Sequence, residues 1–546
     1  VQRLDGRAHG QRGMDTVGGG IEGKQNGHGN RHGWECSECA AFYDVGMRSL
    51  RLSPASRIPP AARPTPRRLA WGLLLWGCAT AGAQSPHPAS PSSLPAPVTA
   101  ALQAQGLPAE AVSLWVAPVD GGPPRLQHLS ETLRPAASVM KLFTTGAALR
   151  TLGPAWTWQT DVALTGTLRP DGTLTGSVHV RGSGDPSLRM EQVSLMLSRW
   201  RGAGLRHIQG DIVLDRTAFQ LPSHDPWAFD GKGLRPYNAG PDALLLNHQA
   251  VTLHLMPDAA RPGQVRVAME PPLASVTVEA ELTPDTRSAC GNWRAALDLQ
   301  MNPAPGWPQH HLSPWRVRVR GPYPLSCGAQ TWPVLWPGAN GEDFAARLLT
   351  QTWRQLGGEL DGQVRSGAWP ADAGIWQSWT SEPLAEVVRD INKFSNNVMA
   401  RQLFLTLGGA EATARTVRET TATSTPSPCG PAQLVLDNGS GLSRTEGSTA
   451  LCLGQWLQAL WASPAMPDLV ASLPLTGVDG TARRWQGAAG HARVKTGSLS
   501  GVAAVAGYVD GKSGRRHVVV GLIQHPDAAQ ARPVLDALLS WVRQDQ

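Results

Sequence analysis

The chain has 546 residues, of which 41% are hydrophobic and 17% are charged. This length is too great for one hydrophobic core and predicts two or three domains, and the composition excludes a wholly disordered protein. The formal net charge is +7, but 11 basic and six acidic side chains lie in residues 1–83, so residues 84–546 carry a net charge of only +2. A body so close to neutral gives no reason to expect a nucleic-acid partner.

Residues 1–46 are rich in Gly, Arg and His and show no apolar periodicity. We interpret them as a non-native segment upstream of a true start at Met47. Cys36 and Cys39 form a C-x-x-C pair, but a zinc site requires a second pair of ligands at suitable spacing. We therefore expect no metal site in this segment.

Residues 47–83 have the pattern of a secretory signal peptide. An arginine-rich stretch precedes an apolar core that begins at Leu69, and Ala81-Gly82-Ala83 matches an A-x-A cleavage site. The apolar core is too short and too Gly-rich to span a membrane, which excludes a polytopic membrane protein. We expect a periplasmic protein whose mature chain starts at Gln84, with lipidation of Cys78 as the alternative.

Residues 84–98 are rich in Pro and Ser and predict a linker. After it, strands are expected at Val112–Pro118 and Arg125–Leu129, which a Gly-Gly-Pro-Pro turn separates. A helix is expected from Met140 to Leu152, because its apolar residues have helical spacing and Gly153-Pro154 ends it.

A β-rich insertion is expected at about residues 159–369. Two alternating runs, Thr160–Thr167 and Thr173–Val180, flank Pro170-Asp171-Gly172 and predict a hairpin. A short helix is expected at Gln192–Trp200. Further runs typical of strands are Asp211–Leu214, Val251–Leu255, Val265–Met269, Val276–Leu282 and Trp315–Val319.

The last third of the chain returns to a mixture of helices and strands. Helices are expected at Asp343–Leu356, Leu384–Ile391, Val398–Leu407 and Ala528–Val542, and strands at Ala492–Thr496, Val502–Val509 and His517–Ile523. We predict an α+β fold in which the two early and three late strands form one antiparallel five-stranded sheet covered by helices. Residues 99–158 and about 370–546 would form this domain, and the large β-rich insertion would interrupt it.

Four cysteines remain in the predicted mature chain. Cys290 and Cys327 flank one β-rich stretch, and export permits disulfides, so we predict a bond between them. The state of Cys429 and Cys452 is left open, and four buried free thiols are the alternative.

Three short motifs could supply chemistry. In Ser138-Val-Met-Lys141, a hydroxyl and an amine three residues apart share one face of a helix, and Ser-Lys pairs are known to activate a nucleophile. The ordinary pKa of lysine, about 10.4, would have to fall through burial and a neighbouring cation. Alone, the motif is equally a helix cap followed by a surface lysine.

The second motif is Ser395-Asn-Asn397, whose hydroxyl and amide can move a proton and hold a carbonyl, although such residues are more often caps. The third is Lys495-Thr496-Gly497-Ser498 on an expected strand. Its hydroxyls and ammonium suit a carboxylate, and Gly497 would let a ligand approach the strand closely.

The order S-x-x-K, S-x-N, K-T-G resembles that of the penicillin-recognising serine enzymes. The long β-rich stretch between the first two motifs resembles the class C low-molecular-mass penicillin-binding proteins, the D-alanyl-D-alanine carboxypeptidase/endopeptidase family. Supporting segments are Gly182-Ser-Gly-Asp-Pro-Ser187, Tyr237-Asn-Ala-Gly-Pro241, Asp437-Asn-Gly-Ser-Gly-Leu-Ser-Arg444 and Leu473–Thr481. One departure is Ser498, where threonine is common in the family, and either residue supplies a hydroxyl.

The resemblance implies a role for each motif residue. Ser138 would be the nucleophile and Lys141 its base, and Ser395 and Lys495 would relay a proton to the leaving D-alanine. The substrate would be bound by Asn397, Thr496, Gly497 and Ser498. Asp437, Asp479 and Arg484 are interpreted as structural.

The sequence therefore predicts a serine DD-peptidase that needs no cofactor or metal. Its partners would be peptidoglycan stem peptides and, as inhibitors, β-lactam antibiotics, and peripheral association with the membrane is left open. Two alternatives stand beside it: a β-lactamase or esterase on the same scaffold, and a non-catalytic cell-wall-binding protein.

Overall fold

The computed structural model describes residues 93–305, 312–338, 341–422 and 429–545. The described residues belong to one compact unit, Pro86–Gln546. The expected start at Met47, the signal peptide and the predicted terminus at Gln84 lie outside the described residues, as do Cys36, Cys39 and Cys78. Within these ranges no helix combines the length and the apolar character that crossing a bilayer requires.

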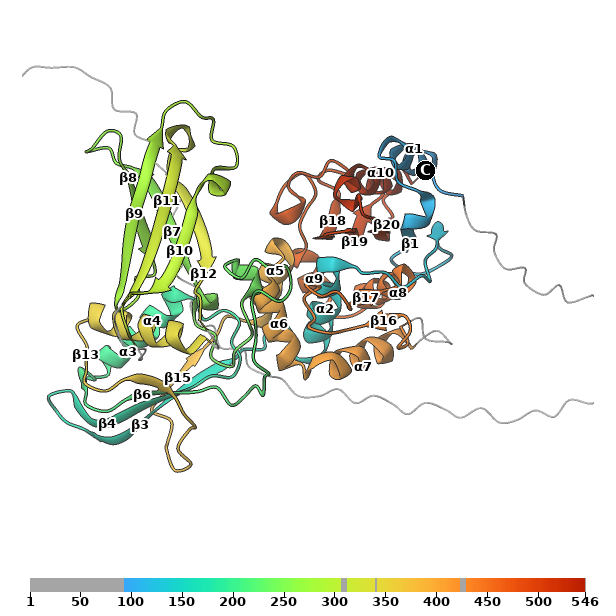
Figure 1. Ribbon diagram of the computed structural model, residues 1–546. Coiled ribbons are helices and arrows are strands. Elements are labelled where there is room, and N and C mark those ends of the chain that lie inside the picture. Colours follow the sequence, from blue (N-terminus) through green and yellow to red (C-terminus); the bar gives the residue numbers. More distant parts are fainter. Residues whose placement is uncertain (1–92, 306–311, 339–340, 423–428, 546) are drawn as a thin grey trace, which may run out of the picture. The chain divides into compact units, whose positions relative to one another are not determined.

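One five-stranded sheet joins the beginning and the end of the described chain (Figure 1). The strands run in the order β18-β19-β20-β1-β2, and every neighbouring pair is antiparallel. Their bounds are β1 Val112–Pro118, β2 Leu126–His128, β18 Ala492–Leu499, β19 Val502–Asp510 and β20 Arg516–Gln524. The predicted antiparallel sheet is confirmed.

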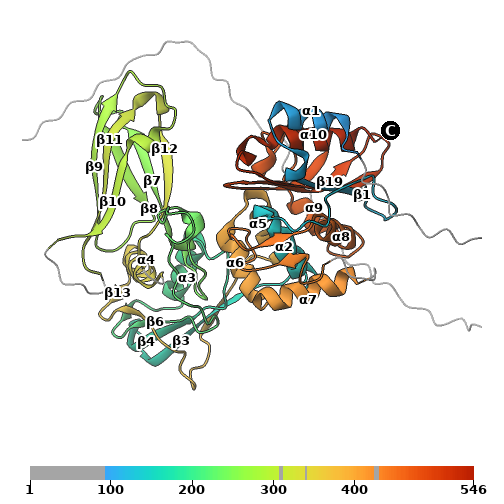
Figure 2. The same ribbon diagram turned by 45° about the vertical axis from the view of Figure 1, so that its right-hand side comes forward.

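The helices of this domain lie on both sides of the sheet. They are α1 Ala96–Ala104, α2 Lys141–Thr151, α5 Leu384–Phe394, α6 Asn397–Thr406, α7 Gly409–Thr421, α8 Ala450–Trp461, α9 Met466–Ser472 and α10 Arg532–Arg543. Figure 2 shows α1 and α10 on one face and α2 and α8 on the other. Because α1 begins at Ala96, the last three residues of the expected linker are helical.

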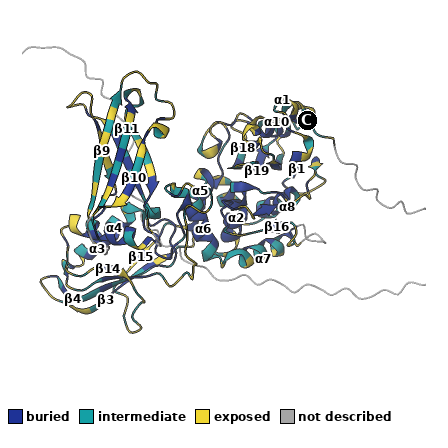
Figure 3. Cartoon of the chain, viewed as in Figure 1, coloured by how far each residue is buried: buried dark blue, intermediate teal, exposed yellow. Residues whose placement is uncertain are grey.

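The alternation of side chains in β1 explains the two covered faces. Leu114 and Val116 lie in one apolar core with residues of α1 and α10. Trp115 and Ala117 point the other way, into a core shared with α2, α5 and α8. With both faces covered, Val502–Val509 of β19 are all buried, and Figure 3 shows this strand in dark blue.

The inserted region contains three sheets around a separate apolar core. A seven-stranded sheet contains β3 Gln159–Leu168, β4 Thr173–Arg181, β5 His207–Ile208, β6 Ile212–Asp215, β13 Glu359–Leu360, β14 Val364–Ser366 and β15 Gln377–Thr380. The two three-stranded sheets are β7 Ala250–Pro257, β8 Val265–Glu270 and β12 Gln330–Leu335, and β9 Val276–Asp285, β10 Asp298–Pro303 and β11 Trp315–Pro324. The helices are α3 Met190–Gly202 and α4 Glu342–Gln355.

Buried hydrogen bonds tie this region to α6. The Gln402 side chain accepts from the Asp242 backbone N–H at 2.9 Å and donates to the Asp242 carbonyl at 2.7 Å. The Arg401 guanidinium donates to the Ala239 carbonyl at 3.1 Å. These contacts fix the helix whose first residue, Asn397, belongs to the second motif.

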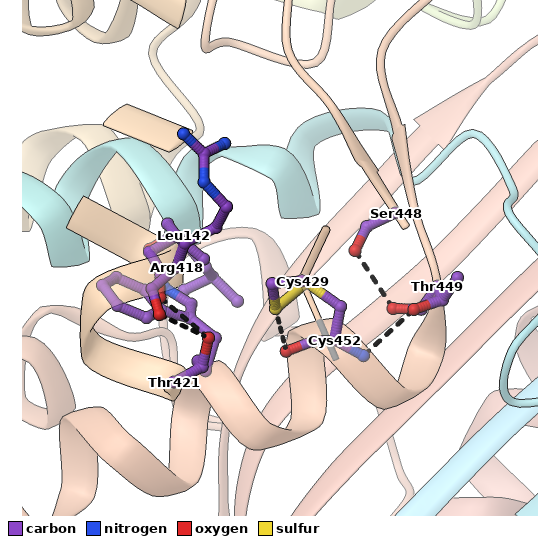
Figure 4. The surroundings of a disulfide bond; sticks show 9 residues. Leu142, Arg418, Thr421, Cys429, Ser448, Thr449 and Cys452 are labelled. Carbon is purple, nitrogen blue, oxygen red and sulfur yellow. Dashed lines mark hydrogen bonds between the residues drawn. A yellow bond between two sulfur atoms is a disulfide. The ribbon is translucent and has the colours of Figure 1, made fainter. Parts of the chain in front are cut away.

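Two disulfides close loops within the described chain. The structure joins Cys290 to Cys327, 37 residues apart, as the sequence predicted, and also Cys429 to Cys452. Cys452 lies in the first turn of α8, where its backbone N–H donates to the N-cap hydroxyl of Thr449 at 3.0 Å (Figure 4). Closing such loops stabilises a fold by roughly 2–4 kcal/mol.

Candidate active site

Ser138 lies on a tight turn immediately before α2. Residues Ala137–Met140 form a 3₁₀ helix, in which residues i and i+3 lie directly above each other. This geometry brings the Lys141 Nζ atom to 3.0 Å from the Ser138 Oγ atom. Ala137 has a φ of 47°, a conformation that costs an ordinary residue free energy and is often found at functional sites.

The surroundings of Lys141 direct its amine toward Ser138. Lys141 is fully buried, and its Nζ donates to Asn397 Oδ1 at 2.5 Å and to the Ser440 carbonyl. Both partners are acceptors only, so a neutral amine would use its two N–H groups on them. Its lone pair would then face the Ser138 hydroxyl.

The environment also favours the neutral amine. Burial lowers the pKa of Lys141 well below its ordinary value, and the positive charge of Lys495 lowers it further. Glu446 acts in the opposite direction on this pKa, but its effect is smaller than that of burial. A neutral amine can accept a proton, which an ammonium cannot.

The second motif spans the junction of two helices. Ser395 ends α5 in a left-handed conformation with a φ of 59°, and α6 begins two residues later. The cap of α6 is the middle residue, Asn396, whose side chain accepts from the Met399 N–H at 3.1 Å. Because Asn396 makes the cap, the side chains of Ser395 and Asn397 remain available to the two lysines.

Lys495 lies in β18 and reaches the second motif. Its Nζ donates to the Ser395 Oγ at 2.9 Å and to the Thr496 carbonyl at 2.8 Å. Burial lowers the pKa of Lys495 to about 7. A group with this pKa can give and take a proton near neutral pH.

Gly497 allows β18 to lie against the turn that carries Ser138. A Cβ atom at Gly497 would lie 2.8 Å from the Ala136 carbonyl oxygen and 3.2 Å from the Ser138 nitrogen. The sequence led us to expect that this glycine makes room for a ligand. That role stays a prediction, and the structure adds a second one: the protein's own backbone lies close to Gly497, so the glycine also lets the strand approach the nucleophile.

A cleft of about 410 Å³ opens above these groups. It is lined by Ser138, Ser395, Thr496, Gly497 and Ser498, together with residues of the C-terminal segment. Lys141 and Lys495 are fully buried next to it. The structure thus brings all eight motif residues named from the sequence to one site, although they lie up to 360 residues apart in the chain.

Sequence reasoning missed Glu446, a carboxylate that is only 2% exposed. It accepts the backbone N–H groups of Asp437, Asn438, Gly439 and Gly441 at 2.6–3.0 Å. The loop therefore curls around this carboxylate, and Ser440 presents its carbonyl to Lys141. The sequence Asp-Asn-Gly-Ser-Gly at residues 437–441, typical of turns, was the available indication of such a loop.

Asp479 has the structural role expected of it. Its carboxylate lies 2.6 Å from Lys393 Nζ and accepts the Leu475 N–H at 2.7 Å. Because Lys393 is in the last turn of α5, this pair fastens the 474–482 loop beside Ser395. Burial alone would raise the pKa of Asp479. The hydrogen bonds from Lys393 and the Leu475 N–H, together with the positive charge of Lys393, hold this pKa below its ordinary value.

An antiparallel sheet between helical layers, with a serine and a buried lysine at the start of a helix beside the edge strand, defines a serine peptidase of the penicillin-recognising class. The chain belongs to the D-Ala-D-Ala carboxypeptidase 3 (S13) family, whose model matches residues 94–545. The enzyme is a serine DD-peptidase.

Individual relatives agree with this assignment. A D-alanyl-D-alanine carboxypeptidase from Actinomadura sp. is 30% identical over 411 residues, which cover 70% of this chain and 72% of the relative. D-alanyl-D-alanine carboxypeptidase DacB from Haemophilus influenzae is 26% identical over 410 residues, 71% of this chain and 80% of the relative. The crystal structure of penicillin-binding protein 4 from H. influenzae superimposes with a TM-score of 0.64 at 20% identity, covering 82% of this chain and 99% of that one.

Proposed function

We propose that Ser138 is the nucleophile and that Lys141 is the general base that activates it. The observation that supports this most directly is the 3.0 Å approach of Lys141 Nζ to Ser138 Oγ, with both other Nζ partners being acceptors. As Ser138 Oγ attacks the carbonyl carbon of the penultimate D-alanine, its proton passes to Lys141 Nζ. The product is an acyl-enzyme, and water then hydrolyses it.

The oxyanion that forms during the attack would be bound by the backbone N–H groups of Ser138 and Ser498. Leu499 and Val502 close a two-residue hairpin between β18 and β19, so they form a hydrogen-bonded pair. In an antiparallel ladder the next pair, Ser498 and Ala503, is not hydrogen-bonded, and the Ser498 N–H points away from β19. Losing one such donor typically lowers the rate by about 10²–10³.

The leaving amine needs a proton before it departs. Ser395 Oγ lies in the cleft, and Lys495 Nζ donates to it at 2.9 Å. Ser395 would give its proton to the amine nitrogen and regain one from Lys495, whose pKa of about 7 suits this exchange. Thr496 and Ser498 would bind the carboxylate of the leaving group, and Asn397 would orient the peptide.

The substrates would be peptidoglycan stem peptides, both at D-Ala-D-Ala termini and at D-alanyl cross-links. β-Lactams would acylate Ser138 because they present a reactive carbonyl next to a carboxylate. The predicted leader places this activity in the periplasm. No cofactor is required by the proposed steps, since every proton transfer has a donor and an acceptor among the chain's own groups.

Defined muropeptides test the substrate assignment. Incubation with a monomeric pentapeptide should release one D-alanine, and a cross-linked dimer should yield two monomers, as read by mass spectrometry. Ser138→Ala protein should do neither, because it lacks the attacking oxygen.

Two further results would favour the alternatives. Rapid turnover of a chromogenic cephalosporin without cleavage of either peptide would identify a β-lactamase. Absence of both peptide cleavage and covalent penicillin labelling in the folded parent would support a non-catalytic wall-binding protein.

Secretion should yield a protein that begins at Gln84, because an A-x-A site follows the short apolar core. N-terminal sequencing of protein recovered from the periplasm checks this expectation. A first residue at Cys78 carrying a lipid mass would contradict it.

A further inference from the structure

A second cavity, of about 650 Å³, adjoins the catalytic cleft and has an unusual lining. We call it the arginine pocket, and its lining residues are Gly480, Thr481, Arg483, Arg484, Trp485 and Arg532. Thr481, Trp485 and Arg532 also line the catalytic cleft. Since three residues contribute to both linings, the two cavities are direct neighbours.

The arginine pocket has an excess of positive charge. In the described part of the chain, no acidic side chain lies within ion-pair distance of Arg483 or Arg484, and both are exposed. Arg532 Nε lies 4.0 Å from Asp536 Oδ2, at the limit of an ion pair. The other Asp536 oxygen accepts the backbone N–H groups of Gln486 and Gly487. The pocket therefore presents three guanidinium groups against one engaged carboxylate and would attract an anionic ligand.

The walls of the arginine pocket are held in place. The Thr481 and Thr496 hydroxyls are hydrogen-bonded at 2.8 Å, which connects the pocket to the third motif. A Cβ atom at Gly480 would lie 2.5 Å from the Lys393 carbonyl, so this loop packs tightly against the end of α5. Trp485, which is 8% exposed, adds an apolar surface shared by both cavities.

The position of the arginine pocket identifies which part of a substrate can reach it. In the proposed function, Thr496 and Ser498 bind the carboxylate beside the cleaved bond, on the leaving side. A leaving D-alanine is a three-carbon amino acid whose one carboxylate those hydroxyls already hold, so it has no group left to reach a further cavity. The leaving half of a cross-link is a whole stem peptide that carries additional carboxylates and an apolar side-chain segment.

We propose that Arg484 and Arg532 form a binding subsite for a carboxylate on the leaving stem peptide of a cross-link. This inference rests on the proposed function and deepens it, because it assigns the endopeptidase substrate to a specific part of the site. Guanidinium groups bind carboxylates in a forked geometry, and the Trp485 ring would pack against the side-chain segment between the cleaved nitrogen and the peptide backbone. The subsite makes no contribution to removal of a terminal D-alanine.

The test compares three substrates. The first is a monomeric pentapeptide, and the second, the acidic dimer, is a cross-linked dimer with all its carboxylates free. The third, the amidated dimer, keeps the leaving-stem carboxylate next to the cleaved nitrogen but has the other carboxylates of that stem converted to amides. The parent should cleave the acidic dimer with a higher kcat/KM than the amidated dimer, and added salt should reduce this preference. Arg484→Gln and Arg532→Gln should each lower kcat/KM for the acidic dimer about threefold to tenfold, mainly through KM, as expected for partly exposed charged contacts.

Arg484→Gln protein should cleave the pentapeptide and react with labelled penicillin within about twofold of the parent, because Arg484 lines the arginine pocket and not the catalytic cleft; this result also shows that the variant is folded. Arg169→Gln is the matched control, because Arg169 is exposed in the hairpin turn between β3 and β4 and lines neither cavity. Its kcat/KM should equal that of the parent on all three substrates.

Equal losses on the pentapeptide and the acidic dimer would overturn the subsite, because the arginines would then act on the carboxylate next to the cleaved bond. No loss on the acidic dimer in either variant would also overturn it. A parent that cleaves no peptide would instead refute the proposed function, so the two failures are distinguishable.

Discussion

Folded Lys141→Arg protein will react with labelled penicillin at least about 10²-fold more slowly than the parent, within the 10²–10⁴ typical of general-base loss. Arginine keeps the positive charge and most of the length of lysine. A guanidinium does not lose its proton in a protein, so it has no lone pair for the Ser138 proton. The substitution therefore removes the base while retaining the cation.

The measurement is the rate of label attachment to Ser138, with Ser138→Ala as the blank. Lys512→Arg is the matched control, because Lys512 is exposed and lies outside the catalytic cleft. It should label at the parental rate. Lys141→Arg protein that labels within about tenfold of the parent would show that Lys141 acts only as a charge or a structural group.

The pH dependence provides a second readout of the same assignment. As the pH falls through the pKa of Lys141, the amine gains a proton and the acylation rate of the parent should decline. Burial and Lys495 hold this pKa well below that of an ordinary lysine, so activity should extend to lower pH than a normal lysine would allow. The residual rate in Lys141→Arg protein should lack this decline.

The long strands of the sheet were predictable because they are short apolar runs rich in β-branched residues and bounded by turn residues, although their side chains are buried on both faces. β1 was expected at Val112–Pro118 and is found there, and α4 lies within one residue of its expected bounds. By contrast, α8 was missed. Seven of its twelve residues are buried and none is exposed, and two glutamines are its only polar side chains, so Ala450–Trp461 has no polar face from which a helical period could be read.

The start of α2 differs from its prediction for a local reason. The sequence predicted a helix from Met140, but Ala137–Met140 form a 3₁₀ turn and the α-helix begins at Lys141. The hydrophobic period does not distinguish the two helix types. The tighter turn is nevertheless what places Ser138 directly above Lys141.

The motif residues could be named from the sequence because their side chains bear the chemistry. The contribution of Ser440 could not, since it is a backbone carbonyl that meets Lys141 across 299 positions of the chain. Every residue has a backbone carbonyl, so the residue type does not indicate which carbonyl will accept a hydrogen bond from Lys141. Our proposal also gives Arg484 a binding role in place of the structural role predicted from the sequence, because its place in the lining of the arginine pocket is visible only in three dimensions.

Glu446→Gln protein is expected to lose about 2–4 kcal/mol of local stability, because the substitution leaves a buried N–H facing an amide NH₂ group. The carboxylate accepts four backbone N–H groups with two oxygens, whereas glutamine offers one oxygen. The loop would then no longer hold the Ser440 carbonyl against Lys141. With one acceptor lost, the Lys141 lone pair is free to turn away from Ser138, and acylation should slow by about tenfold or more.

Two measurements separate this expectation from a general loss of folding. Thermal unfolding followed by circular dichroism reports stability, and labelled-penicillin attachment well below the transition reports the geometry at Ser138. Glu419→Gln is the matched control, because Glu419 is exposed on α7 and its substitution should change stability by no more than about 0.5 kcal/mol.

If Glu446→Gln protein melts and labels like this control, the loop does not depend on the buried carboxylate. If it melts earlier but labels at the parental rate, Glu446 stabilises the fold without positioning Lys141. Only the combined loss fits a carboxylate that holds the Ser440 carbonyl against the catalytic amine.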